Sequence, residues 1–208
     1  MQRIDEVFNQ TLSLKDLSDK NIRYEQIGNV IYMMANPTRL HEAVIFAVMG
    51  QLWNYLHDKP CKAYGSNLGL DLKKFIPALK ALPYLENYFK EKTEKIKDEQ
   101  VYLLPDISVI CDKDESNYGA HGYKSAPKLI IEVYSPSTGA KDFGEKKDIY
   151  ETIGVSEYWI IQDPQNVVVY TLKDGKYLKT EYHTENDILD VPVSVFPDLV
   201  ITFDKNTL

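Results

Sequence analysis

The chain carries several short stretches in which apolar and polar residues alternate with a period of two, the pattern of β-strands with one buried face. Strands are predicted over residues 22–34, 61–72, 101–111, 128–135, 156–163 and 166–183. The first and the last of these ranges are each expected to form two strands joined by a tight turn, at Gly28-Asn29 and at Asp174-Gly175. Pro105 interrupts the third range, so that strand is expected to lie at a sheet edge or to enter the sheet irregularly.

Helical spacing of apolar residues is found in two further stretches. The first runs from residue 38 to residue 59, opens after Pro37 and closes before Pro60. Its core stripe is predicted to consist of Val44, Ala47, Val48, Leu52 and Tyr55. The second helix is predicted over residues 140–153, between two of the strands.

Strands on both sides of two or three helices predict an α/β fold with a mixed sheet flanked by helices. The length of 208 residues and the hydrophobic content of 44% suit one domain over residues 1–208. Residues 73–99 are rich in Lys and Glu and contain two prolines, and they are expected to form an insertion between two strands.

Charge and cysteine content narrow the range of functions. The net charge of −7 argues against a protein that coats DNA through its overall charge, so contact with nucleic acid would need a local basic patch. Cys61 and Cys111 lie far apart in apolar surroundings and are expected to be buried free thiols. The N-terminus lacks an apolar signal region, and no apolar stretch is long enough to span a bilayer, so a cytoplasmic protein without a membrane partner is expected.

Two acidic residues stand out within otherwise apolar strands. Side chains alternate between the two faces of a strand, which gives the strand at 101–111 one apolar face and places Asp106 on the other. The strand at 128–135 has the same arrangement, with Glu132 on its second face. If the two strands are neighbours in a compatible register, the two carboxylates come together and need a cation or a proton between them. Mg²⁺ suits such oxygen-only ligands, and Mn²⁺ is a second option.

The helix predicted at 140–153 contains a lysine on its apolar side. Lys146 falls at the centre of the apolar stripe, whereas Lys147 is turned about a quarter-turn toward water. Asp142 and Tyr150 lie four residues before and after Lys146, along the same side. A buried lysine is costly unless it meets a negative charge, so Lys146 is expected to pair with Glu132 or Asp106. A buried salt bridge with only a structural role would show the same pattern.

The chain resembles the Uma-type family of restriction endonucleases, which belongs to the PD-(D/E)xK nuclease superfamily. The resemblance rests on an ordered run of motifs that covers nearly the whole chain: RYEQIGNVIYMM, YGSNLGL, LLPDISVIC, APKLIIEVYSPST, KDFGEKKDIYETIGVSEYWIIQDP and VVVYTLKDGKY. It implies a restriction-endonuclease-like fold and Mg²⁺-dependent cleavage of DNA. Dimers are common among such nucleases, so the resemblance also suggests a homodimer.

The resemblance assigns roles to particular positions. It implies that Asp106 and Glu132 are catalytic metal ligands and that the carbonyl group of Val133 completes the metal shell. The usual superfamily lysine would fall on Tyr134, and in the Uma-type pattern it has moved to the following helix, where Lys146 matches it as the catalytic lysine.

Two further candidates and one departure follow from the same resemblance. Glu25 matches an acid of the N-terminal hairpin, although its place in the strand pattern also fits an exposed side chain. His41 matches a histidine near the start of the first helix, where a surface or capping role is the alternative. Asn67 stands where many relatives have Asp, which weakens a second-metal role at that position.

The sequence therefore predicts a metal-dependent nuclease that hydrolyses DNA phosphodiester bonds. Two alternatives remain open: a catalytically inactive accessory or DNA-binding protein with the nuclease fold, and a metal-dependent hydrolase of another phosphate ester.

Overall fold

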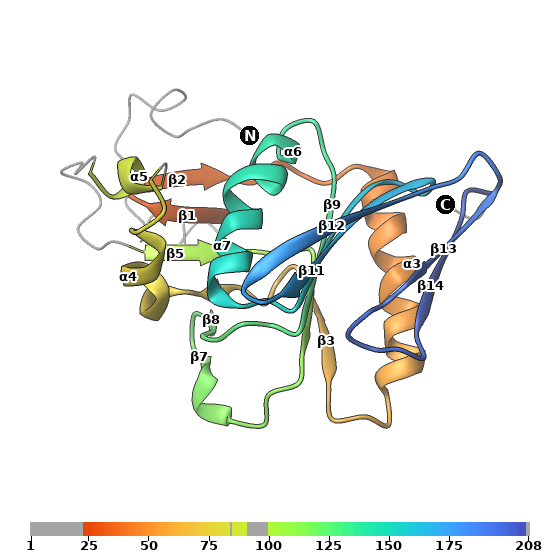
Figure 1. Ribbon diagram of the computed structural model, residues 1–208, viewed down its shortest axis with the longest axis horizontal. Coiled ribbons are helices and arrows are strands. Elements are labelled where there is room, and N and C mark those ends of the chain that lie inside the picture. The colour runs from red at the N-terminus through yellow and green to blue at the C-terminus, as the bar shows by residue number, and fades with distance from the viewer. Residues whose placement is uncertain (1–22, 84, 91–99, 207–208) are drawn as a thin grey trace. The chain divides into compact units, whose positions relative to one another are not determined.

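The computed structural model describes residues 23–83, 85–90 and 100–206 (Figure 1). They belong to two compact units that interleave along the chain. Unit 1 comprises Met1–Asn36, Gly69–Leu104 and Ser116–Ser125, and unit 2 comprises Pro37–Leu68, Pro105–Glu115 and Ala126–Leu208. One domain over residues 1–208 stays a prediction.

Unit 1 is built on a mixed six-stranded sheet with the order β2-β1-β5-β4-β8-β7. Its strands are β1 (Tyr24–Gly28), β2 (Val30–Met33), β4 (Leu70–Asp71), β5 (Gln100–Leu103), β7 (Tyr118–Gly119) and β8 (Gly122–Tyr123). The predicted turn at Gly28-Asn29 is confirmed, and Gly28 has a φ of 58°. A Cβ atom there would lie 2.3 Å from the carbonyl oxygen of Tyr88, so the position requires glycine.

The predicted insertion lies between β4 and β5, which are antiparallel neighbours. Its described part holds a 3₁₀ turn (Lys73–Phe75) and the short helices α4 (Ile76–Leu79) and α5 (Glu86–Lys90). Residue 84 and residues 91–99 of the insertion lie outside the described residues.

Unit 2 contains a second mixed sheet with the order β12-β11-β10-β9-β6-β3. Its strands are β3 (Lys62–Gly65), β6 (Ile107–Ile110), β9 (Leu129–Val133), β10 (Glu157–Asp163), β11 (Asn166–Lys173) and β12 (Lys176–His183). β9 and β10 are parallel, as a strand–helix–strand crossover requires. The connecting helical segment consists of α6 (Gly139–Lys141), a π-helical turn (Asp142–Lys146) and α7 (Lys147–Ile153). The hairpin predicted at Asp174-Gly175 is confirmed by the pairing of β11 with β12.

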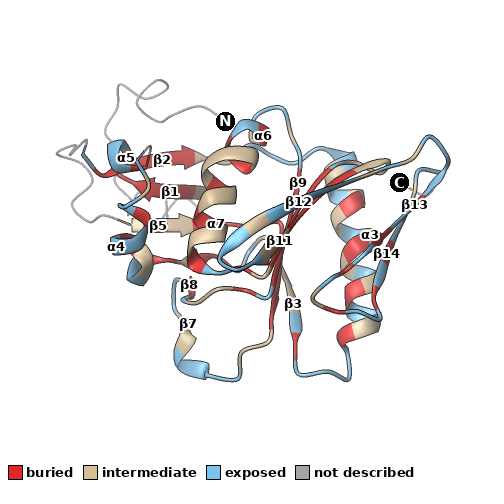
Figure 2. Cartoon of the chain, viewed as in Figure 1, coloured by how far each residue is buried: buried red, intermediate tan, exposed pale blue. Residues whose placement is uncertain are grey.

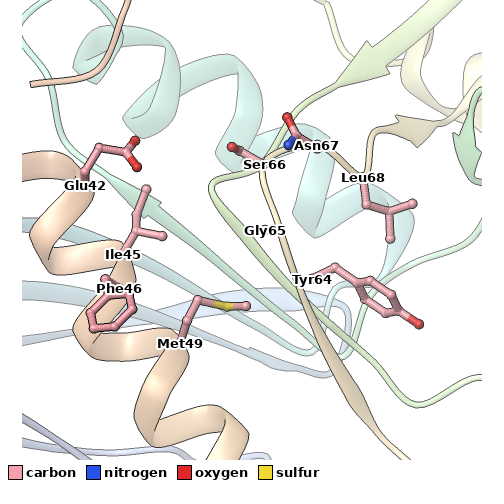
Figure 3. Close-up of a pocket in the computed structure, with 9 residues that line it drawn as sticks. All are labelled: Glu42, Ile45, Phe46, Met49, Tyr64, Gly65, Ser66, Asn67 and Leu68. Carbon is pink, nitrogen blue, oxygen red and sulfur yellow. The ribbon is translucent and has the colours of Figure 1, made fainter.

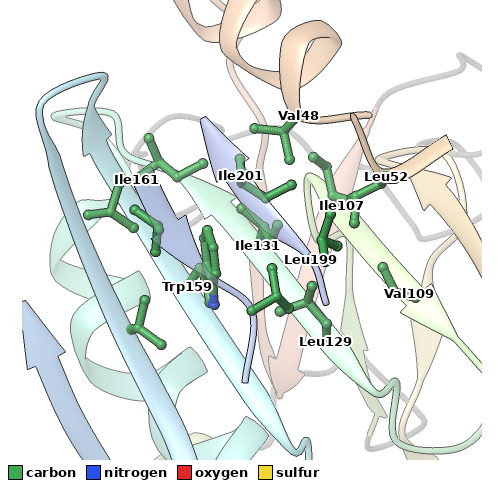
Figure 4. Close-up of a cluster of buried hydrophobic side chains, with 14 of the residues drawn as sticks. Val48, Leu52, Ile107, Val109, Leu129, Ile131, Trp159, Ile161, Leu199 and Ile201 are labelled. Atoms are coloured by element: carbon green, nitrogen blue, oxygen red, sulfur yellow. The ribbon is translucent and has the colours of Figure 1, made fainter. Parts of the chain in front are cut away.

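The core of unit 2 joins one face of this sheet to the long helix α3 (Arg39–Leu56) and to a C-terminal hairpin (Figures 2 and 4). The hairpin consists of β13 (Ile188–Pro192) and β14 (Val200–Asp204). The buried stripe of α3 is Val44, Val48, Leu52 and Leu56, a strict four-residue repeat. Ala47 and Tyr55, which the sequence placed in this stripe, are only half-buried because this repeat turns them toward the rim.

Pro105 interrupts the predicted strand over residues 101–111, as one of the two expectations for it required. It separates β5 from β6, which belong to different sheets, and the boundary between the two units falls between Leu104 and Pro105. β6 lies between β9 and β3, so the expectation of an edge strand is wrong. Because proline has no N–H group, it cannot donate to a ladder and here ends one strand before the next begins.

The expectation of free thiols is also wrong, because Cys61 and Cys111 form a disulfide. β3 and β6 are antiparallel, and Lys62 pairs with Ile110. The next pair outward is therefore Cys61 with Cys111, although 50 residues separate them in the sequence. Spacing alone does not reveal this proximity, since it depends on the strand pairing.

Thiol titration provides a direct check of this disulfide. The unfolded protein is expected to show no free thiol before reduction and both thiols after it. Replacing both cysteines by serine is expected to lower the free energy of unfolding by about 2–4 kcal/mol, because the unfolded chain loses the constraint of a long closed loop. Two reactive thiols in the unreduced protein would contradict the disulfide.

Among the described residues, no helix combines the length and the apolar character that a membrane crossing needs.

Candidate active site

The pairing of β6 with β9 brings the two predicted carboxylates together in unit 2. Ile107 pairs with Ile131, so the next pair outward joins Asp106 and Glu132. The backbone N–H of Asp106 donates to Oε2 of Glu132 at 3.4 Å. The backbone N–H of Val133 donates to Oδ2 of Asp106 at 2.8 Å. These two hydrogen bonds confirm the predicted juxtaposition of the two acidic residues, whose side chains are both buried.

Lys146, from the helical segment between β9 and β10, contacts the carboxylate of Glu132. Its Nζ atom donates to Oε1 of Glu132 at 2.7 Å and lies 3.5 Å from Oδ1 of Asp142. The hydroxyl of Tyr150 donates to the same Oε1 atom at 3.0 Å. Lys146 is only 2% exposed, so these partners replace the water that a charged amine would otherwise need. The predicted meeting of the lysine with Glu132 is confirmed.

A π-helical turn over Asp142–Lys146 shapes this cluster. Such turns interrupt the regular backbone ladder and often occur at functional sites. Here the hydroxyl of Tyr158 donates to the carbonyl oxygen of Asp142 at 3.0 Å. Burial raises the pKa of Tyr158 well above its usual value, and the negative charges of Asp142 and Glu132 raise it further. Tyr158 therefore remains a hydrogen-bond donor that supports the turn.

His41 reaches the site from a different helix, α3. It lies in the first turn of α3, and its Nε2 atom is 3.1 Å from Oδ2 of Asp106. The helix is capped by Thr38, whose hydroxyl accepts from the backbone N–H of His41. The surface or capping role that the sequence left open does not describe His41, because its ring contacts the site.

Replacing His41 by alanine is expected to lower metal affinity or cleavage by about 10- to 100-fold, the usual effect of losing a group that orients a ligand. Asp106 would keep the backbone N–H of Val133 as a partner, so a complete loss is not expected. Calorimetric titration with Mg²⁺ measures the effect. His57→Ala is the matched control, because His57 is an exposed histidine that directly follows α3. Equal behaviour of the two variants would contradict the role of His41.

The remaining sequence candidates have different outcomes. Glu25 lies in unit 1 and is fully buried, so the alternative of an exposed side chain is wrong. Its Oε1 atom accepts from the backbone N–H of Leu104 at 2.9 Å, and a catalytic role for Glu25 stays a prediction. Tyr134, at the usual lysine position, packs its ring against Gly139 and leaves no room for a Cβ atom there. Asn67 is exposed in the loop after β3.

The sequence placed Asp142 and Tyr150 beside Lys146 but gave neither a role. The structure makes Asp142 a second carboxylate for the lysine and Tyr150 a second side-chain donor to Glu132. Their four-residue spacing from Lys146 indicated that both side chains lie on its side of the helix. Which contacts they make there depends on the position of Glu132.

The donor set suits a hard divalent cation. Within the described residues there is no group of three or more His, Cys, Asp or Glu side chains arranged to hold a metal. Mg²⁺ usually binds to one or two carboxylates and completes its shell with water and substrate phosphate, so the pair Asp106 and Glu132 fits it. The cluster also brings the carboxyl groups of Asp106, Glu132 and Asp142 close together around Lys146 and His41, and crowded carboxyl groups favour a bound cation.

Comparison with known proteins identifies the family of this chain. The sequence matches the family described as "Uma2: Putative restriction endonuclease" over residues 8–204. The chain belongs to this family. The uncharacterized protein slr1290 of Synechocystis is 22% identical to it over 167 residues, which cover 79% of this chain and 74% of the relative.

The fold of this chain is also similar to a solved structure described as a putative nuclease belonging to DUF820 from Anabaena variabilis. The TM-score is 0.59 at 18% sequence identity, and the match covers 89% of this chain and 91% of the other. The restriction-endonuclease-like α/β fold that the sequence predicts is therefore confirmed.

Proposed function

We propose that this protein is a metal-dependent nuclease that hydrolyses phosphodiester bonds of DNA. The observation that carries the proposal is the buried cluster in which Asp106, Glu132 and Lys146 meet on adjacent elements of unit 2. The descriptions of the family, "Putative restriction endonuclease", and of the structural neighbour, "putative nuclease", support the same reaction class.

Asp106 and Glu132 would hold Mg²⁺ or Mn²⁺, with the carbonyl group of Val133 as a third ligand. A bound ion supplies a more acidic water molecule and positive charge at the phosphate. Lys146 would orient the attacking water or donate to the phosphate oxygens, on which negative charge develops. His41 orients Asp106, and Tyr150 orients Glu132.

Asp142 has a distinct task in this proposal. When Glu132 turns toward a metal ion, its contact with Lys146 weakens. Asp142 lies 3.5 Å from the same amine and stays beside it, so the buried lysine keeps a negatively charged neighbour.

Cleavage and metal binding together test the proposal. Plasmid, linear and single-stranded DNA are incubated with Mg²⁺ or Mn²⁺, and Mg²⁺ binding is measured by calorimetry. Asp106→Asn is expected to lose both, because it removes a ligand charge, whereas Asp198→Asn, at an exposed acid of the same unit, is expected to keep both. A homodimer, which is common among nucleases of this kind, and a cytoplasmic location belong to the proposal as well.

The outcomes separate the alternatives. Metal binding without DNA cleavage would favour a hydrolase of another phosphate ester. If the protein showed neither metal binding nor cleavage, the result would favour an inactive accessory protein, in which the cluster is only a buried ion pair.

A further inference from the structure

An open pocket of about 520 Å³ lies in unit 2 between α3 and the end of β3 (Figure 3). Both of its walls adjoin the candidate active site. Glu42 directly follows His41, which contacts Asp106. Gly65 pairs with Ile107, the residue after Asp106. The pocket is lined by Glu42, Ile45, Phe46, Met49, Tyr64, Gly65, Ser66, Asn67 and Leu68.

The lining combines an aromatic surface with a few polar groups. Phe46 is 82% exposed, which is unusual for a large apolar side chain, and Ile45 and Met49 extend the apolar wall. Ser66 and Asn67 offer hydroxyl and amide groups from the loop on the opposite side (Figure 3). Sites for small planar ligands typically show this mixture of apolar walls and a few polar groups.

The charge of the lining selects against phosphate. None of the nine lining residues is Lys or Arg, and the carboxylate of Glu42 would repel an anion. A carboxylate and an amide instead suit the N–H groups on the edge of a nucleobase. An aromatic ring suits the face of a base, whatever its sequence.

We propose that this pocket binds one unpaired base of the DNA substrate, next to the phosphate held at Asp106 and Glu132. The inference rests on the proposed nuclease function and specifies its substrate as single-stranded or locally unpaired DNA. The base stacks on Phe46 and presents its pairing edge to Glu42 and Asn67. A base inside a duplex cannot do this, because its face is stacked and its pairing edge is occupied.

Gly65 provides a way to block the pocket without disturbing the fold. A Cβ atom at Gly65 would have no atom within 4 Å, and the φ of Gly65 lies outside the left-handed region. Gly65→Leu therefore fills the pocket with little strain. Gly50→Leu is the matched control, because Gly50 is equally open, lies on the exposed side of α3 and does not line the pocket. Phe46→Ala removes the stacking surface.

Fluorescence anisotropy with a labelled ten-nucleotide single strand, and with the same strand in a duplex, tests the proposal in the presence of Ca²⁺. The wild type is expected to prefer the single strand. Gly65→Leu and Phe46→Ala are each expected to weaken single-strand binding about tenfold, as loss of a base–aromatic contact does, with little effect on the duplex. Gly50→Leu is expected to bind as the wild type does, and thermal unfolding checks that each variant folds.

Three results would overturn the proposal. They are equal wild-type affinity for the two forms of DNA, equal weakening of both forms by Gly65→Leu, and a change in oligomeric state caused by Phe46→Ala. The last result would make the exposed face of α3 a self-association surface. Failure of the nuclease proposal itself is seen separately, as absence of metal-dependent cleavage by the wild type.

Discussion

Replacing Glu132 by alanine is expected to abolish metal-dependent cleavage and also to destabilise the fold. The variant loses a proposed metal ligand and the closest partner of Lys146, whose Nζ atom lies 2.7 Å from Oε1. The lysine would remain buried with Asp142 at 3.5 Å as its nearest described carboxylate. Removing one member of a buried ion pair usually costs about 3–5 kcal/mol, so the free energy of unfolding should fall by about that amount.

Chemical denaturation and Mg²⁺ calorimetry measure the two effects of Glu132→Ala separately. Glu181→Ala is the matched control, because Glu181 is an exposed strand acid on β12 that pairs with Lys179. If Glu132→Ala lost stability but still bound Mg²⁺ and cut DNA, Glu132 would be a structural counter-ion rather than a ligand.

The central contact of the site could be predicted because each half of it violates a simple local pattern. Glu132 interrupts an apolar strand, and Lys146 interrupts an apolar helix stripe. A buried charge is costly unless it lies beside a charge of opposite sign. The crossover from β9 to β10 packs the helix against β9, so the two charged side chains can reach each other. The same reasoning brought Asp106 to Glu132 once the two strands were taken as neighbours.

A strand acid alone was not a sufficient signal, as Glu157 shows. It is fully buried at the start of β10, and burial raises its pKa. Its carboxylate accepts from the indole N–H of Trp159 and the backbone N–H of Val195. These contacts tie the start of a strand to the loop around Ser194 and Val195, and the charge of Lys128 acts on Glu157 only as a minor influence. The presence of Lys146 in an apolar helix stripe therefore distinguished Glu132, a candidate site residue, from Glu157, a structural acid.

The features that the sequence did not predict depend on the pairing of distant segments. The disulfide between Cys61 and Cys111 follows from the pairing of β3 with β6, and the pocket exists because the end of β3 lies beside α3. Local periodicity specifies which face of an element is buried, but it does not specify which other element covers it. Pro105 gave a correct signal of interruption, yet its consequence, a change of sheet, was set by the fold.

Replacing Lys146 by methionine is expected to reduce cleavage by about 10²- to 10³-fold while preserving metal binding, whereas a ligand variant is expected to lose both. Methionine keeps much of the length and apolar contact of the lysine but has no charge. Glu132 would keep the Tyr150 hydroxyl, which donates to Oε1 at 3.0 Å. Since the amine no longer competes for that oxygen, Mg²⁺ affinity should stay the same or rise.

Lys147→Met is the matched control for this last prediction, because Lys147 is adjacent in the sequence, partly exposed and paired with Asp148. It is expected to cut DNA as the wild type does. If Lys146→Met cut DNA at the wild-type rate, the lysine would serve only to neutralise Glu132. If it lost Mg²⁺ binding, the lysine would be needed to hold Glu132 in place. Reduced turnover with intact binding is the result that assigns Lys146 to the chemical step, because that combination separates stabilisation of developing charge from assembly of the site.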